Sequence, residues 1–444
     1  MVPLLKIRVL ALVFLIFFAT SLLAKDIDIK AFSVLPENEL ISNDDFIIKI
    51  QNIIITQPEF RQAIAVKGEF QENRKFASRQ RFPSLTAQII NDRTISRDIE
   101  SGNRLRKTQD DAFDAQVIID QPIYTGNEIN SKVKIAKLEI SRASIELSKI
   151  ASELILTASE IYINASSSMI LSDYCSDLFE DLKKYRDIVK RRFDGGIISA
   201  SEMAIVNVRL SEIEAKLARL EADKIKTASI YRSFFKEEYK GFGLPNLSLL
   251  NIYDITKLNN IESYDELIAK NAIENKEADL ELTKSQYRPK LGFNARYTQY
   301  DVDEDAEDSD IRGGIYFSFP IFNFGRGSAQ ISASKARINQ AKINSEKSRR
   351  DKESQIASVI GSSSGTLQAR NRLEDSYINI KLQRETYFNS LSSSQFSIAA
   401  LLEAALRELN LFEQLVANEK ELVLADLQSS HLNRALLNRF KISY

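Results

Sequence analysis

Few residues of this chain have the types and spacing that catalysis requires. The sequence holds one histidine, His431, which lies in a Leu- and Asn-rich helical stretch without a nucleophile motif. A single histidine also rules out a cluster of histidine metal ligands, and no glycine-rich nucleotide-binding pattern occurs. Carboxylates are plentiful, but no acid pair stands in a recognisable pocket context. The sequence therefore predicts that the protein is not an enzyme and has no cofactor and no metal site.

The acidic residues 301–310 and the single cysteine could each have a chemical role, but a structural explanation fits both better. The acidic residues 301–310 could bind Ca²⁺ loosely, but they lack the glycine and terminal glutamate of an EF-hand loop, which favours a solvated surface loop. Cys175 is the only cysteine, so we expect no intrachain disulfide and a small buried hydrophobe on a helical seam. With 60 basic and 61 acidic residues, no strong field favours nucleic acid as a partner.

Residues 1–24 have the pattern of a secretory signal peptide. Lys6 and Arg8 form a charged start, and an apolar run with small residues at its end follows. A membrane anchor is the alternative, but the apolar run is short for a span that needs about 20 residues. The sequence has no cysteine near the cleavage site, so we do not expect a lipidated N-terminus. We expect no later segment to be long and apolar enough for a transmembrane helix, so an exported protein would be periplasmic, secreted or a barrel protein.

The chain is organised around a very long helical hairpin, predicted over residues 126–235. Apolar residues recur in alternating steps of four and three on both sides of Gly195-Gly196, which is the narrow seam of a coiled coil. At about 1.5 Å per residue, the arm before the glycines would be roughly 100 Å long. A helix of that length needs packing along its whole length. The glycine pair supplies a fold-back, so the first partner is the chain's own return arm.

Two shorter helical regions are predicted at residues 42–80 and 263–286. Ser42 or Asn43 can cap the first region, and acidic residues follow at the positive end of the helix dipole. Pro58 interrupts this region, and we expect it in the first turn of a second helix.

At Pro83 the period of the apolar residues changes from about 3.6 to 2, which indicates strands. Apolar and polar residues alternate over 85–89 and 113–119, and the polar residues 91–111 between them predict a long loop. One face of each strand is thus apolar, while the other carries charges and amide groups. A soluble sandwich and an outer-membrane barrel both produce that pattern.

The same plan occurs a second time. Tyr-Arg-Pro-Lys-Leu at 287–291 resembles Arg-Phe-Pro-Ser-Leu at 81–85, and a second strand pair and long helical hairpin follow. The predicted segments are a signal peptide (1–24), a first repeat (25–235) with a strand pair at about 83–122 and a hairpin at about 126–235, a connector (236–262), and a second repeat (263–444) with a strand pair at about 289–320 and a hairpin at about 325–440.

Two strands per repeat cannot close a barrel, so several chains would have to complete the sheet. Three chains would give twelve strands, and the helices would continue the cylinder beyond the membrane. In the last strand the apolar face would meet lipid and the polar face the lumen; the residues are Ile311, Ile315, Phe317 and Phe319 on the first face, and Arg312 and Ser318 on the second. The predicted fold class is mainly α with a membrane β-barrel.

These pieces together resemble the TolC-type outer-membrane efflux family, over nearly all of the mature chain from about Asp44 to Leu437. The matching pieces are Gln57-Pro58-Glu59-Phe60, Pro83-Ser84-Leu85, Gln121-Pro122-Ile123-Tyr124-Thr125-Gly126, Arg192-Phe193-Asp194-Gly195-Gly196 with Glu202 downstream, and second copies around Pro289, Pro320 and Gly325. Each piece alone is weak, whereas their order, spacing and duplication are specific. The resemblance implies a homotrimer with a twelve-strand barrel in the outer-membrane lipid and an α-helical tunnel crossing the periplasm.

The resemblance also implies partners and cargo. The tunnel would dock on an inner-membrane transporter, ABC or proton-driven, through a periplasmic adaptor (a membrane fusion protein). The absence of a lipid-anchor cysteine favours type I protein secretion by analogy, with drug or metal efflux as the alternative. A periplasmic or surface coiled-coil scaffold without a pore is the alternative from another class. It explains the helices but not the two strand pairs with apolar faces.

By the same resemblance, the functional residues lie at the tips of the two hairpins, which meet the adaptor and close the entrance. The implied docking residues are Gly195, Gly196 and Ile197 in the first tip, and Ile398, Ala399 and Ala400 in the second, which is shorter and lacks the expected glycine. The implied gate residues are Arg192, Phe193, Glu202, Phe396 and Glu403. In a trimer, Glu403 would give a ring of three carboxylates that attracts cations. A solvated glutamate on a helix face explains Glu403 equally well.

Overall fold

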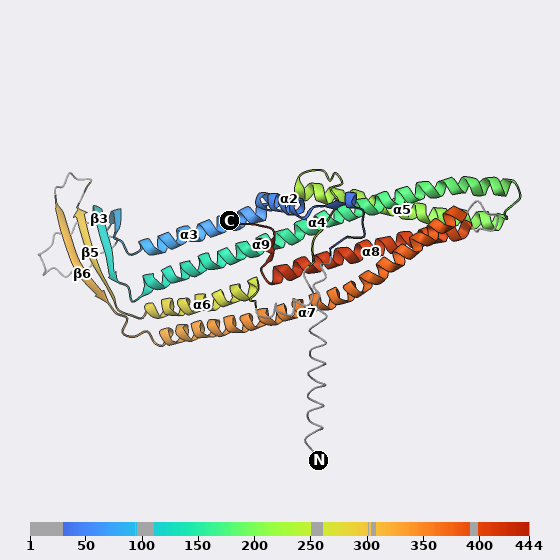
Figure 1. Ribbon diagram of the computed structural model, residues 1–444. Helices are drawn as coiled ribbons and strands as arrows, with labels where there is room; N and C mark the ends of the chain where they lie inside the picture. The colour runs from blue at the N-terminus through green and yellow to red at the C-terminus, as the bar shows by residue number, and fades with distance from the viewer. Residues whose placement is uncertain are drawn as a thin grey trace, which may run out of the picture. The chain divides into compact units, whose positions relative to one another are not determined.

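The computed structural model describes residues 30–93, 95, 111–249, 261–300, 302, 308–390 and 398–443. The predicted signal peptide, Phe396 and most of the two predicted loops lie outside the described residues. Helices make up most of the described chain (Figure 1). The elements in chain order are η1 (Glu37–Glu39), β1 (Leu40–Ile41), α2 (Asn43–Thr56), α3 (Pro58–Arg79), β2 (Ser84–Arg93), β3 (Asp111–Tyr124), α4 (Glu128–Asp194), α5 (Ala200–Phe235), β4 (Leu244–Pro245), α6 (Tyr264–Ser285), β5 (Lys290–Gln299), β6 (Ser309–Ser318), α7 (Arg326–Asn389), α8 (Ile398–Leu432) and α9 (Leu436–Arg439).

The first helices begin where the sequence predicts. Ser42 is extended ahead of α2, and its hydroxyl accepts a hydrogen bond from the Asp45 amide at 3.2 Å. Pro58 is the first residue of α3, a position where a backbone N–H group would have no hydrogen-bond partner within the helix. The Ser42 cap and the proline start are therefore confirmed.

Two long helical hairpins follow the strand pairs. α4 is one unbroken helix of 67 residues and α7 is one of 64. Each has a return helix, α5 of 36 residues and α8 of 35. The order helix, strand pair, long helix, return helix thus occurs twice along the chain.

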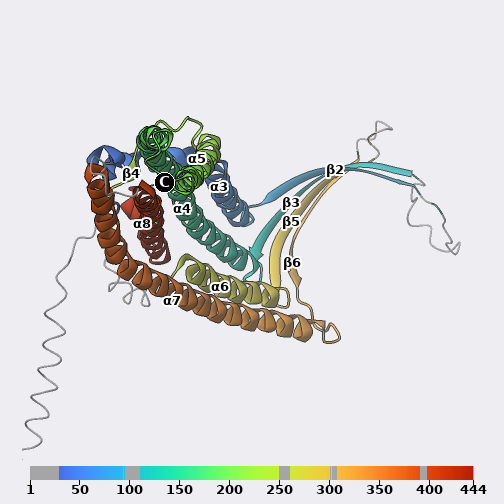
Figure 2. The ribbon, with the colours of Figure 1, turned by 90° about the vertical axis from the view of Figure 1, so that its right-hand side faces the viewer.

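The four long strands form one antiparallel sheet in the order β2-β3-β5-β6 (Figure 2). The β3–β5 pairing joins the two predicted strand pairs. The strands reach further than the alternation of apolar residues indicates. Asn91 pairs with Phe113, and Asp310 pairs with Thr298, so the ends of the predicted loops are strand residues. Backbone hydrogen bonds to the neighbouring strand hold these polar ends in the sheet.

The chain divides into two compact units. The hairpin unit contains Met1–Arg61, Ser148–Ser263 and Arg350–Tyr444, and the sheet unit contains Gln62–Leu147 and Tyr264–Arg349. Each unit takes residues from both sequence repeats, because α3, α4 and α7 contribute to both units.

A hydrophobic core ties α4, α5 and α8 together in the hairpin unit. Its buried members are Cys175, Leu178, Phe179, Leu182, Tyr185, Val189, Val206, Leu210, Ile213, Leu220, Ile398, Leu401, Leu402, Ala405 and Leu409. Cys175 is fully buried there, and burial raises the pKa of its thiol to about 11. The expectation of a buried cysteine on the helical seam is confirmed.

A buried ion pair fastens the N-terminal residues of the described chain to α7 and α8. Glu419 is 1% exposed, pairs with Arg370, and accepts a hydrogen bond from the Phe32 amide at 3.0 Å. Arg370 also donates to the Lys30 carbonyl at 2.9 Å and to the Ser33 hydroxyl at 3.1 Å. Both charges therefore have the additional partners that a buried ion pair needs.

Gly243, beside the short β1–β4 pair, is a position that the backbone reserves for glycine. Its φ is +83°, and an added Cβ would lie 2.7 Å from the Glu39 carbonyl oxygen. Gly243→Ala is therefore expected to lower the free energy of unfolding by about 1–3 kcal/mol for the backbone conformation alone, measured by denaturant unfolding. Gly68→Ala in α3 is the control, since nothing lies within 4 Å of its added Cβ and alanine favours the helix. Equal losses in the two variants would contradict the assignment.

By length and composition, α4 is the one helix among the described residues that could cross a membrane. Half of its most apolar window is buried inside the protein, and the core helix of a soluble protein passes the same test. The expectation that no segment after the leader reaches this hydropathy is therefore wrong. The stretch around Tyr162 is buried in the protein and nearly free of charged residues, which raises its hydropathy.

Candidate functional site

The first hairpin tip ends α4 in a two-bond helix cap. Gly196 has a φ of +70°, and its amide donates to the Phe193 carbonyl at 2.9 Å. The Ile197 amide donates to the Arg192 carbonyl at 2.9 Å. This is the Schellman arrangement, in which glycine takes the left-handed position. Of the predicted glycine pair, only Gly196 needs the positive φ, and Gly195 lacks one.

Two apolar side chains of this tip face solvent. Ile197 is 75% exposed and Phe193 is 38% exposed. The residue after a Schellman glycine commonly packs back against its own helix, and the exposure of Ile197 shows that it does not do so here. The tip therefore presents an apolar side chain that a second surface could cover.

Glu202 has a structural role at the start of α5. The Ser199 hydroxyl accepts from the Glu202 amide at 3.2 Å, and the Glu202 carboxylate accepts from the Ser199 amide at 3.0 Å. These two bonds form a capping box, which satisfies amides that the first turn of a helix leaves unpaired. The predicted role of Glu202 in a gate stays a prediction beside this one.

At the second tip, the structure describes the chain from Ile398 onward, and Phe396 lies outside the described residues. Ile398 begins α8, is 7% exposed and belongs to the core of the hairpin unit. Ala399 and Ala400 are half-buried. The three predicted docking residues of this tip are thus less accessible than Ile197 of the first tip.

Glu403 pairs with Arg209 and so ties α8 to α5. The Arg209 guanidinium lies 2.8 Å from the Glu403 carboxylate, whose side chain is 55% exposed. Arg209 also donates to the Glu212 carboxylate at 2.8 Å; this hydrogen bond and the charge of Glu403 raise the pKa of Arg209. A second tie between the same helices joins Lys216 and Glu413 at 2.5 Å. The spacing of the residues along the sequence does not predict these cross-helix pairs.

A buried polar network that the sequence analysis missed links α4, α7 and α8. The Glu408 side chain is fully buried and accepts hydrogen bonds from the Tyr174 hydroxyl and the Arg384 guanidinium. The Tyr377 hydroxyl donates to that of Tyr174 at 3.3 Å. One carboxylate therefore connects both hairpins of the hairpin unit.

The electrostatics of this network favour a charged pair with a protonated phenol. Burial alone would lower the pKa of Arg384, but the hydrogen bond and charge of Glu408 raise it overall. Burial and the Glu408 charge hold the pKa of Tyr174 far above its usual range, so its phenol keeps the proton that it donates. One sequence signal could have found the network: Glu408 falls on the apolar stripe of α8, between Ala405 and Phe412.

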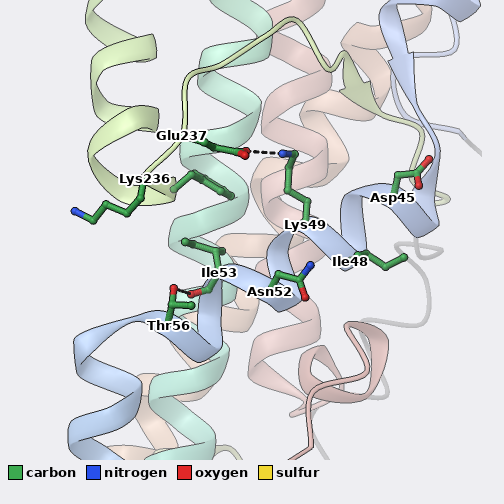
Figure 3. Close-up of a pocket in the computed structure, with 9 residues that line it drawn as sticks. Asp45, Ile48, Lys49, Asn52, Ile53, Thr56, Lys236 and Glu237 are labelled. Atoms are coloured by element: carbon green, nitrogen blue, oxygen red, sulfur yellow. Dashed lines mark hydrogen bonds and ion pairs between the residues drawn. The ribbon is translucent and has the colours of Figure 1, made fainter.

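A groove of about 530 Å³ lies between α2 and the end of α5 (Figure 3). The Lys49 ammonium lies 2.5 Å from the Glu237 carboxylate and 3.8 Å from the centroid of the Phe242 ring. The lining residues include no histidine or cysteine; they are Asp45, Ile48, Lys49, Asn52, Ile53, Thr56, Phe235, Lys236 and Glu237. In the described part of the chain, no group of three or more His, Cys, Asp or Glu residues could hold a metal ion. The Lys49–Glu237 pair joins α2 to the residues that follow α5.

The sheet unit exposes a broad apolar face. Its largest exposed side chains, each 69–80% accessible, are Leu85, Ile89, Ile311, Ile315 and Phe317. The register pairs odd-numbered residues with odd-numbered residues across all four strands, so these side chains share one face. The opposite face carries polar and charged residues, among them Gln88, Gln116, Arg296 and Arg312. An apolar surface of this extent marks a contact with lipid or protein.

The outer edges of this sheet are open. Within the described residues, β2 pairs only with β3, and β6 pairs only with β5. An open edge leaves a row of backbone N–H and C=O groups for another strand. A single chain therefore holds an incomplete sheet.

Comparison with known proteins identifies this architecture. No protein-family model and no curated protein matches the sequence. The CmeC outer membrane channel of Campylobacter jejuni aligns with a TM-score of 0.74 and 13% identity, over 91% of this chain and 91% of that chain. The MtrE outer membrane channel of Neisseria gonorrhoeae, in its open state, aligns with a TM-score of 0.73 and 13% identity over 93% and 95%. The outer membrane protein VceC of Vibrio cholerae gives 0.68 and 15% over 89% and 95%.

The chain has the fold of the outer-membrane channels. The alignments cover about nine-tenths of each chain, so this channel fold accounts for the strands as well as for the helical hairpins. The predicted resemblance to the TolC-type efflux proteins is thereby confirmed for the fold. At 13–15% identity, the roles of single residues must come from this chain's own geometry.

Proposed function

We propose that the protein is an outer-membrane duct, the exit component of a tripartite export system. The observation that carries this proposal is the four-stranded sheet with an exposed apolar face and two open edges. Both features are unfavourable in water. In a closed barrel within lipid, the apolar face meets hydrocarbon and every edge finds a partner strand.

Closure of the barrel requires further copies of the chain. Four strands are too few to close, and three chains give the twelve strands of the proposed homotrimer. The strands alternate in direction along the sheet, so β6 of one chain can pair antiparallel with β2 of the next. The face with Arg296 and Arg312 would then line a water-filled lumen, where charged side chains stay hydrated.

The hairpin unit is proposed to form the periplasmic part of the duct and to carry its entrance. The exposed Ile197 of the first tip is the docking point for a periplasmic adaptor, which connects the duct to an energised inner-membrane transporter. The residues of the second tip would take part after the core around Ile398 loosens. The proposed cargo is a polypeptide, as in type I secretion, with drugs or metal ions as the alternative.

The test of the duct is conductance. Leader-free protein, purified in detergent and added to a planar lipid bilayer, is expected to form a trimer on unheated gels and to open discrete water-filled channels. A pore-free coiled-coil scaffold would remain in the soluble fraction and leave the bilayer silent. Stable monomers in both buffer and detergent, without conductance, would reject the proposal.

Glu403→Ala tests the proposed gate. Removing a carboxylate from each of three chains also frees Arg209 from its cross-helix partner. The expected result is a higher single-channel conductance or a lower cation selectivity in the bilayer. Glu413→Ala is the matched control, because Glu413 also ties α8 to α5 but lies three helical turns further from the tip. An unchanged trace from a well-folded Glu403→Ala trimer removes Glu403 from the gate.

A further inference from the structure

The chain contains an internal joint where its two repeats meet in the sheet unit. β3 ends beside the start of β5, and the turn into α4 uses two left-handed residues, Gly126 (φ +63°) and Asn127 (φ +76°). Arg288, just ahead of β5, covers this turn. An added Cβ at Gly126 would lie 2.8 Å from the Arg288 Cβ, and the Arg288 guanidinium donates to the Gly126 carbonyl at 3.4 Å. Glycine is required because the neighbouring repeat lies against it.

The turn from β6 into α7 has the same backbone, but within the described residues no strand beyond β6 brings a counterpart of Arg288 against it. Phe324 (φ +51°) and Gly325 (φ +82°) occupy the two left-handed positions directly ahead of the helix. The Arg326 amide donates to the Asn323 carbonyl at 3.1 Å, as the Glu128 amide donates to that of Thr125 in the first turn. Phe324 thus takes the place of Gly126. Its ring centroid lies 4.7 Å from that of Phe322, yet the Phe324 side chain is 87% exposed.

A phenylalanine at this position is unfavourable on two counts within one chain. A bulky residue in the left-handed region is strained, and its ring is left in water. Local choices that break such rules without compensation mark a functional contact. The contact with Phe322 of the same chain leaves both rings largely exposed, so a contact that covers Phe324 would lie outside the single chain.

The repeat itself indicates what covers Phe324. In the aligned sequences, Arg288 corresponds to Phe82, since both precede the proline that leads into a strand. Phe82 stands ahead of β2, at the open edge of the sheet, and is 67% exposed. Suppose that β6 pairs with a neighbour's β2 in the register that β3 and β5 have within one chain, which we call the β3–β5 template. Phe317 then lies opposite the partner subunit's Ile89. Both residues belong to the apolar face, so the template keeps that face continuous.

We propose that Phe324 and the partner subunit's Phe82 form an aromatic contact that seals each junction between chains where the barrel meets the helices. This inference rests on the proposed trimer. At the joint within one chain, an added Cβ at Gly126 would lie too close to the Cβ of Arg288. The joint between chains, where Phe324 would meet the partner subunit's Phe82, must therefore be wider. Two rings fill the added space, and aromatic pairs favour separations of about 4.5–7 Å between ring centroids. The occupant of this exposed apolar turn is therefore a second copy of the chain, not lipid.

Disulfide trapping tests the contact, since the chain's one cysteine can be removed. In a Cys175→Ala background, Phe82→Cys with Phe324→Cys is expected to give covalent dimers and trimers on non-reducing gels after mild oxidation. Phe76→Cys with Phe324→Cys is the matched control, because Phe76 is about as exposed as Phe82 but lies within α3, before the residues that lead into β2. Equal cross-linking of both pairs, or of neither, would overturn the contact.

A second pair separates this inference from the proposed trimer. Phe317→Cys with Ile89→Cys reports the pairing of β6 with a neighbour's β2, and covalent oligomers are expected from it. If this pair cross-links while the Phe82–Phe324 pair does not, the trimer stands and the aromatic contact is wrong. If purified protein is monomeric and neither pair cross-links, the proposed trimer fails as well.

Phe324→Gly distinguishes the contact from simple backbone strain by the sign of its effect. Glycine relieves the left-handed strain, so a residue without a partner in the neighbouring chain would give a trimer that dissociates at a higher temperature on semi-native gels. The proposed contact predicts a lower dissociation temperature, because each trimer loses three aromatic pairs. Phe324→Tyr, which keeps the ring, is expected to restore the dissociation temperature. A rise with glycine would overturn the proposal.

Discussion

Glu408→Ala is expected to lower the free energy of unfolding of the hairpin unit by about 3–5 kcal/mol, the range for removing one partner of a buried ion pair. The substitution leaves the Arg384 guanidinium, 17% exposed, without its carboxylate. It also removes the acceptor of the Tyr174 hydroxyl, deep between α4 and α8. Thermal or denaturant unfolding of the leader-free protein, followed by circular dichroism, measures the loss.

Two variants show whether the loss comes from the unpaired charge. Glu413→Ala removes a carboxylate that is 43% exposed and ties α8 to α5, and we expect about 0–1 kcal/mol from it. In the double variant Arg384→Met with Glu408→Leu, neither charge remains, and much of the stability is expected to return. A Glu408→Ala loss no larger than that of Glu413→Ala would show that the network does not stabilise the fold.

Ile315→Arg is expected to prevent most of the protein from inserting into the outer membrane. Ile315 lies within β6, is 72% exposed and belongs to the apolar face of the sheet. An arginine on the lipid face of a barrel costs about 2–4 kcal/mol near the middle of the bilayer, and three subunits repeat the cost. The measurement is the fraction of heat-modifiable trimer recovered with outer membranes.

Gly314→Arg is the control for this substitution. Gly314 directly precedes Ile315 in the same strand, so a side chain there would point to the opposite face of the sheet, and nothing lies within 4 Å of an added Cβ. An arginine there would enter the water-filled lumen and should leave insertion largely intact. Equal recovery of the two variants would show that the apolar face does not meet lipid.

Much of this fold could be predicted because it depends on neighbours in the sequence. The seam of α4, the Ser42 cap, the start of α3 at Pro58 and the left-handed Gly196 each follow from residues within about one helical turn. The two faces of the strands follow from their alternation in the same way. These local preferences were strong enough to indicate a channel architecture that sequence identity of 13–15% conceals.

The candidate site was less accessible to sequence analysis, because its contacts join distant residues. Glu202 matched a gate position, yet its carboxylate caps α5. Ile398 matched a docking tip, yet it is buried in the core of the hairpin unit. In both cases the residue type fits two roles, and the spacing of the residues does not show which contacts the side chain makes in the folded chain.

The amino-acid order specifies the duplicated plan, the long helices and the apolar face of the strands, since spacing within a few residues is enough for each. The folded chain adds the β3–β5 junction, the open edges of β2 and β6, and the Glu408 contact with Tyr174 and Arg384. Tyr174 and Glu408, for example, are 234 positions apart in the sequence. Local periodicity does not predict these long-range contacts, because their stabilising energy arises only when burial brings the two partners together.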